Sequence, residues 1–171
     1  MSASEIRHQP WNVLFLCRAN SARSQIAQVL LTKLGGDRFK AYSAGSQPAA
    51  QVHPMTLEVL RGMDYPLDQL RTKSWDEFAG SHAPVMDFVF TVCDDTAGEV
   101  CPTWPGQPLS AHWGFPDPVA AQGTEAQQMI SFGETLRQIR RRLEAFVALP
   151  IDKLDRLALY ERVKEIGREP V

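Results

Sequence analysis

The chain has 171 residues, of which 44% are apolar and 22% charged, and its formal net charge is −2. This length favours one domain with a sizeable core, and the small net charge argues against nucleic acid or a membrane surface as a partner. No apolar run is long enough to span a membrane, and the N-terminus lacks a signal-peptide core, so we expect a cytoplasmic protein with a flexible lead-in over residues 1–10. Three cysteines there indicate redox or catalytic chemistry rather than structural disulfides.

The first predicted element is a short buried strand, Val13 to Leu16, which leads into a helix. The helix is indicated by apolar residues that share one face, namely Ile26, Val29, Leu30 and Leu34. Between strand and helix lie Cys17 and Arg23, with five residues between them. Such a loop turns unpaired backbone N–H groups and the positive end of the helix dipole inward, so it predicts an anion site.

The side chains of this loop suit attack on a bound oxyanion. Arg23 offers a planar fork of donors for two oxygens of a tetrahedral anion, and Cys17 at the bottom of a positive cup is expected to have a pKa well below about 8.5. Asn20 tolerates a positive φ, and Ser24 is placed to donate to the thiolate. We predict Cys17 and Arg23 as catalytic and an oxyanion-binding loop of Arg18, Ala19, Asn20, Ser21, Ala22, Arg23 and Ser24. The alternative is a buried structural cysteine with an arginine nearby by chance.

A second strand is predicted over Phe39 to Gly45, with Ser43 near its end. If it lies parallel to the first strand, Ser43 could support the Cys17 loop, for example through Asn20; an ordinary turn serine is equally compatible. Pro54 is expected to open a short helix. The stretch 62–84 is poorly determined by its sequence, apart from a short helix predicted over residues 75–78.

A third strand is predicted from Val85 to Val92 and ends at Cys93, and Cys101 follows eight residues later. This spacing does not match a zinc site. The two cysteines could be inert apolar residues. Alternatively, Cys93 ends its strand at the sheet edge where Cys17 ends another, which would bring two thiols together with Cys101 nearby.

A fourth strand is predicted from Leu109 to Gly114, and Asp117 follows between two prolines. The prolines hold Asp117 in an extended loop. A carboxyl near the anion cup could protonate a departing oxygen; the alternative is an ordinary turn aspartate. We expect His112 to lie at the rim and Trp113 to be a packing residue.

Thr124 is predicted to cap a long helix that Pro150 ends, and its Arg140–Arg142 cluster is expected to be a solvated face. A last helix is predicted over 152–166, within a segment 151–171 that packs on the domain or on a dimer partner. Strands and helices alternate, so we predict a single α/β domain over 11–150, with a four-stranded parallel sheet, helices on both faces and a flavodoxin-like order.

Over roughly residues 11–148 the chain resembles the arsenate reductases of the low-molecular-weight tyrosine phosphatase type. The matching parts are the loop 17–24, residues 42–45, Cys93, Cys101, and 112–115 leading into Asp117. The resemblance implies a low-molecular-weight phosphatase-like fold, Cys17 as nucleophile, Arg23 as oxyanion ligand and Asp117 as acid. It also implies that Cys93 and Cys101 pass a disulfide outward to thioredoxin.

Two departures from that family qualify what carries over. Gln28 stands where potassium-binding members have a glutamate, so a potassium site is doubtful. The interval from Cys93 to Cys101 is one residue longer than in the thioredoxin-coupled type, so thioredoxin, glutaredoxin or another thiol could be the electron donor. We expect no metal and no tightly bound cofactor, only arsenate, phosphate or sulfate in the Cys17 loop.

Three functions of different classes follow. The first is reduction of arsenate to arsenite through a relay of Cys17, Cys93 and Cys101, with weak phosphatase activity beside it. The second is a phosphotyrosine phosphatase that uses Cys17, Arg23 and Asp117 alone. The third is a non-catalytic oxyanion-binding or redox-sensing module. The later cysteines favour the first over the second, and the set of nucleophile, arginine and acid argues against the third.

Overall fold

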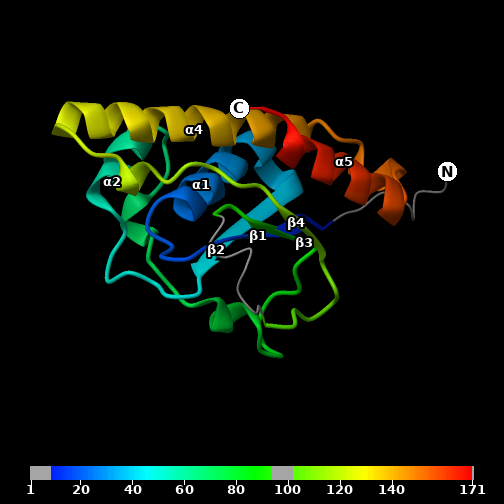
Figure 1. Ribbon diagram of the computed structural model, residues 1–171. Helices are drawn as coiled ribbons and strands as arrows, with labels where there is room; N and C mark the ends of the chain where they lie inside the picture. The colour runs from blue at the N-terminus through cyan, green and yellow to red at the C-terminus, as the bar shows by residue number, and fades with distance from the viewer. Residues whose placement is uncertain (1–8, 94–101, 171) are drawn as a thin grey trace.

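The computed structural model describes residues 9–93 and 102–170, and its centre is a parallel four-stranded sheet (Figure 1). The strands are β1 (Trp11–Cys17), β2 (Phe39–Gly45), β3 (Phe88–Thr91) and β4 (Leu109–His112). Their order is β2-β1-β3-β4, the flavodoxin-like winding that the sequence predicts. In such a sheet the carboxyl ends of neighbouring strands meet at one edge, which places the end of β1 beside that of β3.

Four α-helices lie between and after the strands in the described chain: α1 (Arg23–Gly35), α2 (Pro54–Leu60), α4 (Glu125–Val147) and α5 (Arg156–Arg168). Short 3-10 helices join them: η2 (Gly36–Arg38), η3 (Leu67–Gln69), η4 (Trp75–Phe78), η5 (Pro118–Ala120) and η6 (Ile151–Lys153). Thr124 caps α4 as predicted, and Gln127 completes a reciprocal capping box. Because Asp155 caps α5, this helix begins at Arg156, later than the predicted residue 152.

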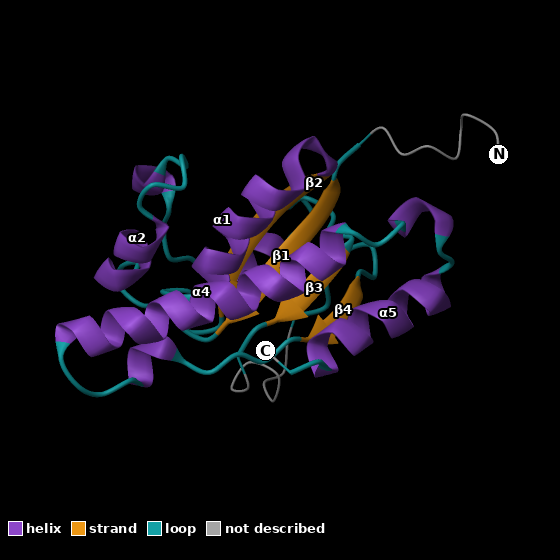
Figure 2. Ribbon diagram, turned by 90° about the horizontal axis from the view of Figure 1, so that it is seen from above, coloured by secondary structure: helices purple, strands orange, loops and turns teal. Residues whose placement is uncertain are grey.

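The two faces of the sheet are covered differently. Helices α1, α4 and α5 lie over one face, as the two views show (Figures 1 and 2). Val13 and Phe15 of β1 point into that layer, whereas Leu14 and Leu16 point to the other side, the period of two expected of a strand. There, within the described residues, the cover is the 3-10 helix η4 together with the side chains of Met86 and Trp104.

Helix α5 packs against the edge of the sheet through Trp113, which is 1% exposed. The indole stacks on Phe90 at 4.0 Å between ring centroids and donates its N–H to the carbonyl of Val163 at 3.0 Å. A Cβ at Gly167 would lie 2.5 Å from the same indole, so the helix needs a glycine at this contact. Trp113 is therefore a packing residue, as predicted.

Two sequence predictions need correction here. Strand β3 begins at Phe88 rather than Val85, because Val85 is 54% exposed and the carboxylate of Asp87 instead accepts the backbone N–H of Asn12 at 2.8 Å. The Arg140–Arg142 cluster is not wholly solvated, because Arg142 is buried while its two neighbours are exposed. In the described ranges, no helix has the length and apolarity needed to cross a membrane.

Candidate active site

The loop after β1 is held by its carbonyl groups. Every backbone oxygen from Arg18 to Ala22 accepts a hydrogen bond from outside the cup. The donors are the backbone N–H groups of Gln47, Ala49, His53 and Ile26 and the side chains of Gln25 and Thr56. Because C=O and N–H point in opposite directions across a peptide unit, anchoring the oxygens outward turns the loop N–H groups inward.

The same loop lines a pocket of about 130 Å³ at the start of α1. The pocket is lined by Cys17, Arg18, Ala19, Ser21, Ala22, Arg23, Asp117 and Val119. Ala22 occupies the N-cap position of α1, and no side chain caps the helix there. The uncapped helix N-terminus and the loop amides together form a site for an anion.

Two of the residues predicted to bind the oxyanion lie behind the pocket instead. Asn20 and Ser24 are fully buried and do not line it. Asn20 has a φ of 53°, the left-handed conformation expected for it, and this turns its amide side chain toward Ser24. Arg18 is exposed and its guanidinium contacts Gln47 at 3.1 Å, so its side chain lies at the rim.

Ser24 and Asn20 surround the sulfur of Cys17 with donors. The Sγ of Cys17 lies 2.8 Å from the Ser24 hydroxyl and accepts the backbone N–H of Asn20 at 3.2 Å. The side-chain amide of Asn20 donates to the same hydroxyl oxygen at 2.7 Å. Because that oxygen already accepts a bond, its hydrogen is free to point at the sulfur, an arrangement that suits a thiolate.

The predicted low pKa of Cys17 is nevertheless wrong in direction. Burial raises the pKa of the thiol above its ordinary value, because Cys17 is only 3% exposed and the charged form of its sulfur loses hydration. The hydrogen bond from Ser24 opposes this effect, and the charge of Arg23 lowers the pKa further by a smaller amount. The loop geometry that offers donors to an anion also removes water from the nucleophile.

Arg23 connects the cup to the loop that carries Asp117. Its Nη1 donates to the carbonyl of Phe115 at 2.9 Å, and its Nη2 lies 3.7 Å from a carboxylate oxygen of Asp117. The Asp117 side chain is 41% exposed, and its other oxygen accepts the N–H of Val119 at 3.0 Å at the start of η5. Both Arg23 and Asp117 line the pocket, so the structure brings the predicted nucleophile, arginine and acid together.

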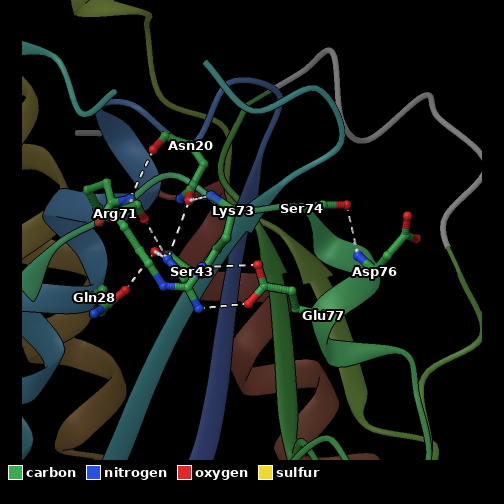
Figure 3. A network of polar contacts seen from close by, with 9 residues as sticks. Asn20, Gln28, Ser43, Arg71, Lys73, Ser74, Asp76 and Glu77 are labelled. Atoms are coloured by element: carbon green, nitrogen blue, oxygen red, sulfur yellow. Dashed lines mark hydrogen bonds and ion pairs between the residues drawn. The ribbon is translucent and has the colours of Figure 1, made fainter. Parts of the chain in front are cut away.

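A lysine that the sequence analysis did not single out supports the loop from behind (Figure 3). The ammonium of Lys73 lies 2.9 Å from the carbonyl of Arg71 and 3.4 Å from both Asn20 Oδ1 and Ser43 Oγ. Burial, and to a smaller extent the charge of Arg71, lower the pKa of Lys73 to about 8. Arg71 itself is held in a bidentate pair with Glu77, at 2.7 and 3.0 Å.

Ser43 thus reaches Asn20 through Lys73 rather than directly. Its hydroxyl donates to Gln28 Oε1 at 2.6 Å, and the amide of Gln28 donates to the hydroxyl of Tyr65 at 3.2 Å. The serine, the glutamine and the lysine come from different elements that meet below the loop (Figure 3). The side-chain oxygens of Asn20 and Ser43 therefore both contact the ammonium of Lys73.

Gly45, at the end of β2, is a second residue that the sequence analysis did not single out. A Cβ there would lie 2.5 Å from the carbonyl oxygen of Arg18 and 3.0 Å from both Cys17 O and Asn20 N. The loop therefore approaches the backbone of β2 as closely as only glycine allows. Sequence reasoning could have identified Gly45 from its position, because it is a glycine at the end of a predicted strand that neighbours a predicted anion-binding loop.

A second buried thiol, Cys93, lies beside the first. The N–H of Val92 donates to the carbonyl of Leu16 at 2.8 Å, so the segment that leads to Cys93 runs beside the end of β1. Leu16 pairs with Thr91, and Cys93 follows Thr91 by two residues. Both cysteines are buried, and a charge on Cys93 raises the pKa of Cys17, so the two thiols lie within electrostatic reach of each other. Cys101 lies outside the described residues. Within the described part of the chain, no group of three or more His, Cys, Asp or Glu side chains is arranged to hold a metal.

Comparison with known sequences identifies relatives over most of the chain. The family described as low molecular weight phosphotyrosine protein phosphatase matches residues 12–158. The arsenate reductases of Oceanobacillus iheyensis and Bacillus subtilis are each 34% identical over 134 residues, which is 78% of this chain and 93% of each relative.

Comparison with solved structures gives the same fold. A thioredoxin-dependent arsenate reductase of Corynebacterium glutamicum has a TM-score of 0.53 at 25% identity, over 82% of this chain and 65% of that one. An arsenate reductase in its oxidised state has a TM-score of 0.64 at 22% identity, over 80% and 96%. A low molecular weight phosphotyrosine phosphatase of Vibrio cholerae has a TM-score of 0.58 at 18% identity, over 80% and 93%.

Proposed function

The chain belongs to the low-molecular-weight phosphotyrosine protein phosphatase family, and we propose that it is an arsenate reductase that converts arsenate to arsenite with thiol electrons. The observation that carries this proposal is the pair of buried thiols, Cys17 at the end of β1 and Cys93 two residues after the end of the adjacent strand β3. Phosphate-ester hydrolysis uses one thiol, whereas reducing As(V) to As(III) requires two electrons and therefore two thiols.

In the first step of the proposal, arsenate binds in the pocket against the loop amides and the guanidinium of Arg23. The thiolate of Cys17 attacks arsenic, and an arsenic–oxygen bond breaks. Asp117 donates its proton to the departing oxygen, which leaves as water. The product is a Cys17 thiol–arsenate adduct that still contains As(V).

In the second step, the thiolate of Cys93 attacks the sulfur of Cys17. A disulfide forms between the two residues, the sulfur–arsenic bond breaks and its electron pair stays on arsenic, which leaves as arsenite. Cys101 then attacks Cys93, which frees Cys17 and leaves a Cys93–Cys101 disulfide for an external dithiol to reduce. We propose thioredoxin as that donor, with glutaredoxin or another thiol as the alternatives, and the cytoplasm as the compartment that keeps it reduced.

Three cysteine variants test this sequence of steps. Cys17→Ser is expected to abolish arsenite release and all phosphatase activity. Cys93→Ser should stop arsenite release but retain hydrolysis of p-nitrophenyl phosphate, because hydrolysis does not need the second thiol. Cys101→Ser should release one equivalent of arsenite and then stop with a Cys17–Cys93 disulfide, which peptide mass spectrometry detects. Normal cycling of Cys101→Ser with thioredoxin or glutaredoxin would contradict the relay.

A phosphotyrosine phosphatase is the second candidate, favoured by the pocket that joins Cys17, Arg23 and Asp117 without Cys93. The two functions differ in what Cys93→Ser does. If the chain is primarily a phosphatase, this variant keeps its full physiological rate, and the wild-type protein releases no arsenite with either donor. An arsenate reductase is also expected to show weak hydrolysis, because the same donors fit a phosphoryl group.

A further inference from the structure

We propose that Arg142 of α4 is a positioning residue that fixes the loop carrying Asp117 and so controls proton donation to the departing oxygen. The inference rests on the proposed function, in which Asp117 is the acid. It adds a residue that lies behind the pocket and does not touch the oxyanion. The sequence analysis assigned no role to this arginine, which was expected on a solvated face.

Arg142 binds the loop at two adjacent residues. Its Nη1 donates to the carbonyl of Gly114 at 2.9 Å, and the centre of its guanidinium lies 4.6 Å from the ring centroid of Phe115. Its Nη2 donates to the carbonyl of Glu169 at the end of α5, at 3.1 Å. The guanidinium therefore joins α4, the loop before Asp117 and the end of the last helix.

The backbone of Phe115 is held by two further hydrogen bonds. Its carbonyl accepts a hydrogen bond from Arg23 at 2.9 Å, and its N–H donates to the carbonyl of Val92 at 3.2 Å. Asp117 follows two residues later, between two prolines that restrict the backbone. Arg142 thus holds the ring of Phe115, and Arg23 and Val92 hold its backbone. Because the prolines also limit backbone rotation, the position of Gly114 and Phe115 determines where the Asp117 carboxyl lies.

Packing alone does not account for an arginine at this position. Arg142 is 7% exposed, burial lowers the pKa of its guanidinium, and its Nε is buried without a hydrogen-bond partner among the described residues. Well-packed apolar residues often replace buried charges without loss of stability. What an apolar residue could not supply is the pair of directed donors that join Gly114 to Glu169.

The test compares Arg142→Met and Arg142→Lys with Arg141→Met, a matched change at the exposed neighbouring arginine. Each protein is assayed with phenyl phosphate, a poor leaving group that needs an acid, and with p-nitrophenyl phosphate, a good one. We expect Arg142→Met to lower kcat/KM about tenfold for phenyl phosphate and less than about twofold for p-nitrophenyl phosphate, since small misplacements of a catalytic group are costly. In an Asp117→Asn background, Arg142→Met should cause no further loss. Arg141→Met should match the wild type.

Hydrogen exchange tests the same contact independently of turnover. Arg142→Met should speed exchange at the amides of Phe115 and Val119 while Val13 to Leu16 stay protected. Arg142→Lys should show the same change to a smaller extent, and it takes the place of Arg142→Met in the test if that variant fails to fold. Three results would overturn the positioning role. They are an equal loss of kcat/KM on both substrates, a further loss of kcat/KM when Arg142→Met is added to Asp117→Asn, and unchanged hydrogen exchange at Phe115 and Val119. If the wild-type protein shows neither arsenite release nor hydrolysis, the proposed function fails, and the exchange experiment still decides whether Arg142 fixes the loop.

Discussion

The ammonium of Lys73 lies 3.4 Å from the side-chain oxygen of Asn20, and the amide of Asn20 in turn donates to the hydroxyl of Ser24 at 2.7 Å. Ser24 is the residue that contacts the nucleophile, 2.8 Å from Cys17 Sγ. A positive charge behind the loop therefore orients Asn20, and Asn20 orients the donor that faces the sulfur. Lys73 acts as a support for the nucleophile although it does not line the pocket.

Lys73→Met is expected to lower the reactivity of Cys17 without abolishing oxyanion binding in the pocket. The change removes the contacts of the ammonium with Asn20, Ser43 and the carbonyl of Arg71, each of which is a hydrogen bond to a charged donor. A loss of roughly 1.5 kcal/mol corresponds to a tenfold lower kcat/KM. Steady-state arsenite release measures it, with Lys164→Met, a change at a half-buried lysine of α5, as the control. An unchanged rate would show that Asn20 is held well enough by its backbone.

The lowered pKa of Lys73 predicts opposite pH trends for activity and stability. Because its pKa is about 8 in the folded protein and about 10.5 when unfolded, the folded protein binds fewer protons between these values. The contribution of this group to the free energy of unfolding therefore increases as the pH rises through that window. The support of Asn20 decreases in the same window, because the ammonium loses its charge. Comparing urea unfolding and kcat/KM of wild type and Lys73→Met from pH 7 to 10 isolates both effects; parallel trends would contradict the assignment.

The same ammonium leads to an expectation about potassium. Ser43, Gln28 and Asn20 supply oxygens below the loop, but Lys73 already contacts two of them, and the Gln28 oxygen accepts the hydroxyl of Ser43. We therefore expect equal rates in potassium chloride and choline chloride at the same ionic strength. A rate that rises with potassium at fixed ionic strength would require a cation site that the lysine does not fill.

Ser24→Ala tests the hydrogen bond that opposes the raised pKa of Cys17. Removing it should raise that pKa further, because the hydrogen bond from the hydroxyl stabilises the charged thiolate. The pH profile of iodoacetamide alkylation measures the pKa in a Cys93→Ser, Cys101→Ser background, where only Cys17 reacts. Thr32→Ala, an exposed hydroxyl on the same helix, is the control and should leave the profile unchanged. A profile unaffected by Ser24→Ala would mean that the hydroxyl does not donate to the thiolate.

The sequence predicts the strand order and the catalytic loop because both depend on local signals. The apolar run of β1, the Cys17-to-Arg23 spacing and the apolar stripe of α1 lie within about twenty residues of one another. Arg142 was accessible to the same kind of reasoning, since it lies three residues after Ile139 and next to Leu143 on the buried face of α4. The three consecutive arginines indicated a solvated face, and this prediction did not consider the helical position of each arginine.

The supporting residues could not be predicted, because their partners are far apart in the chain. Lys73 is 53 residues from Asn20 and 30 from Ser43, and no sequence pattern around Lys73 indicates that it contacts them. The direction of the Cys17 pKa was missed for a related reason. The positive cup is a local feature of the loop, but the burial that outweighs it comes from β3 and the helices packed over the sheet.

Gly45→Ala tests whether close approach of the loop to β2 shapes the pocket. The added methyl would lie 2.5 Å from the carbonyl oxygen of Arg18, so the loop must shift, and overpacking of this kind costs about 1–3 kcal/mol of stability. We expect the variant to fold, because the change lies at the end of a strand, but to lose the rise in melting temperature that millimolar phosphate gives the wild type. Gly80→Ala is the matched control, since no atom of the described residues lies within 4 Å of a Cβ built there. If Gly45→Ala keeps the full phosphate-dependent rise, the loop can form its anion site without this contact, and the closeness of β2 serves packing alone.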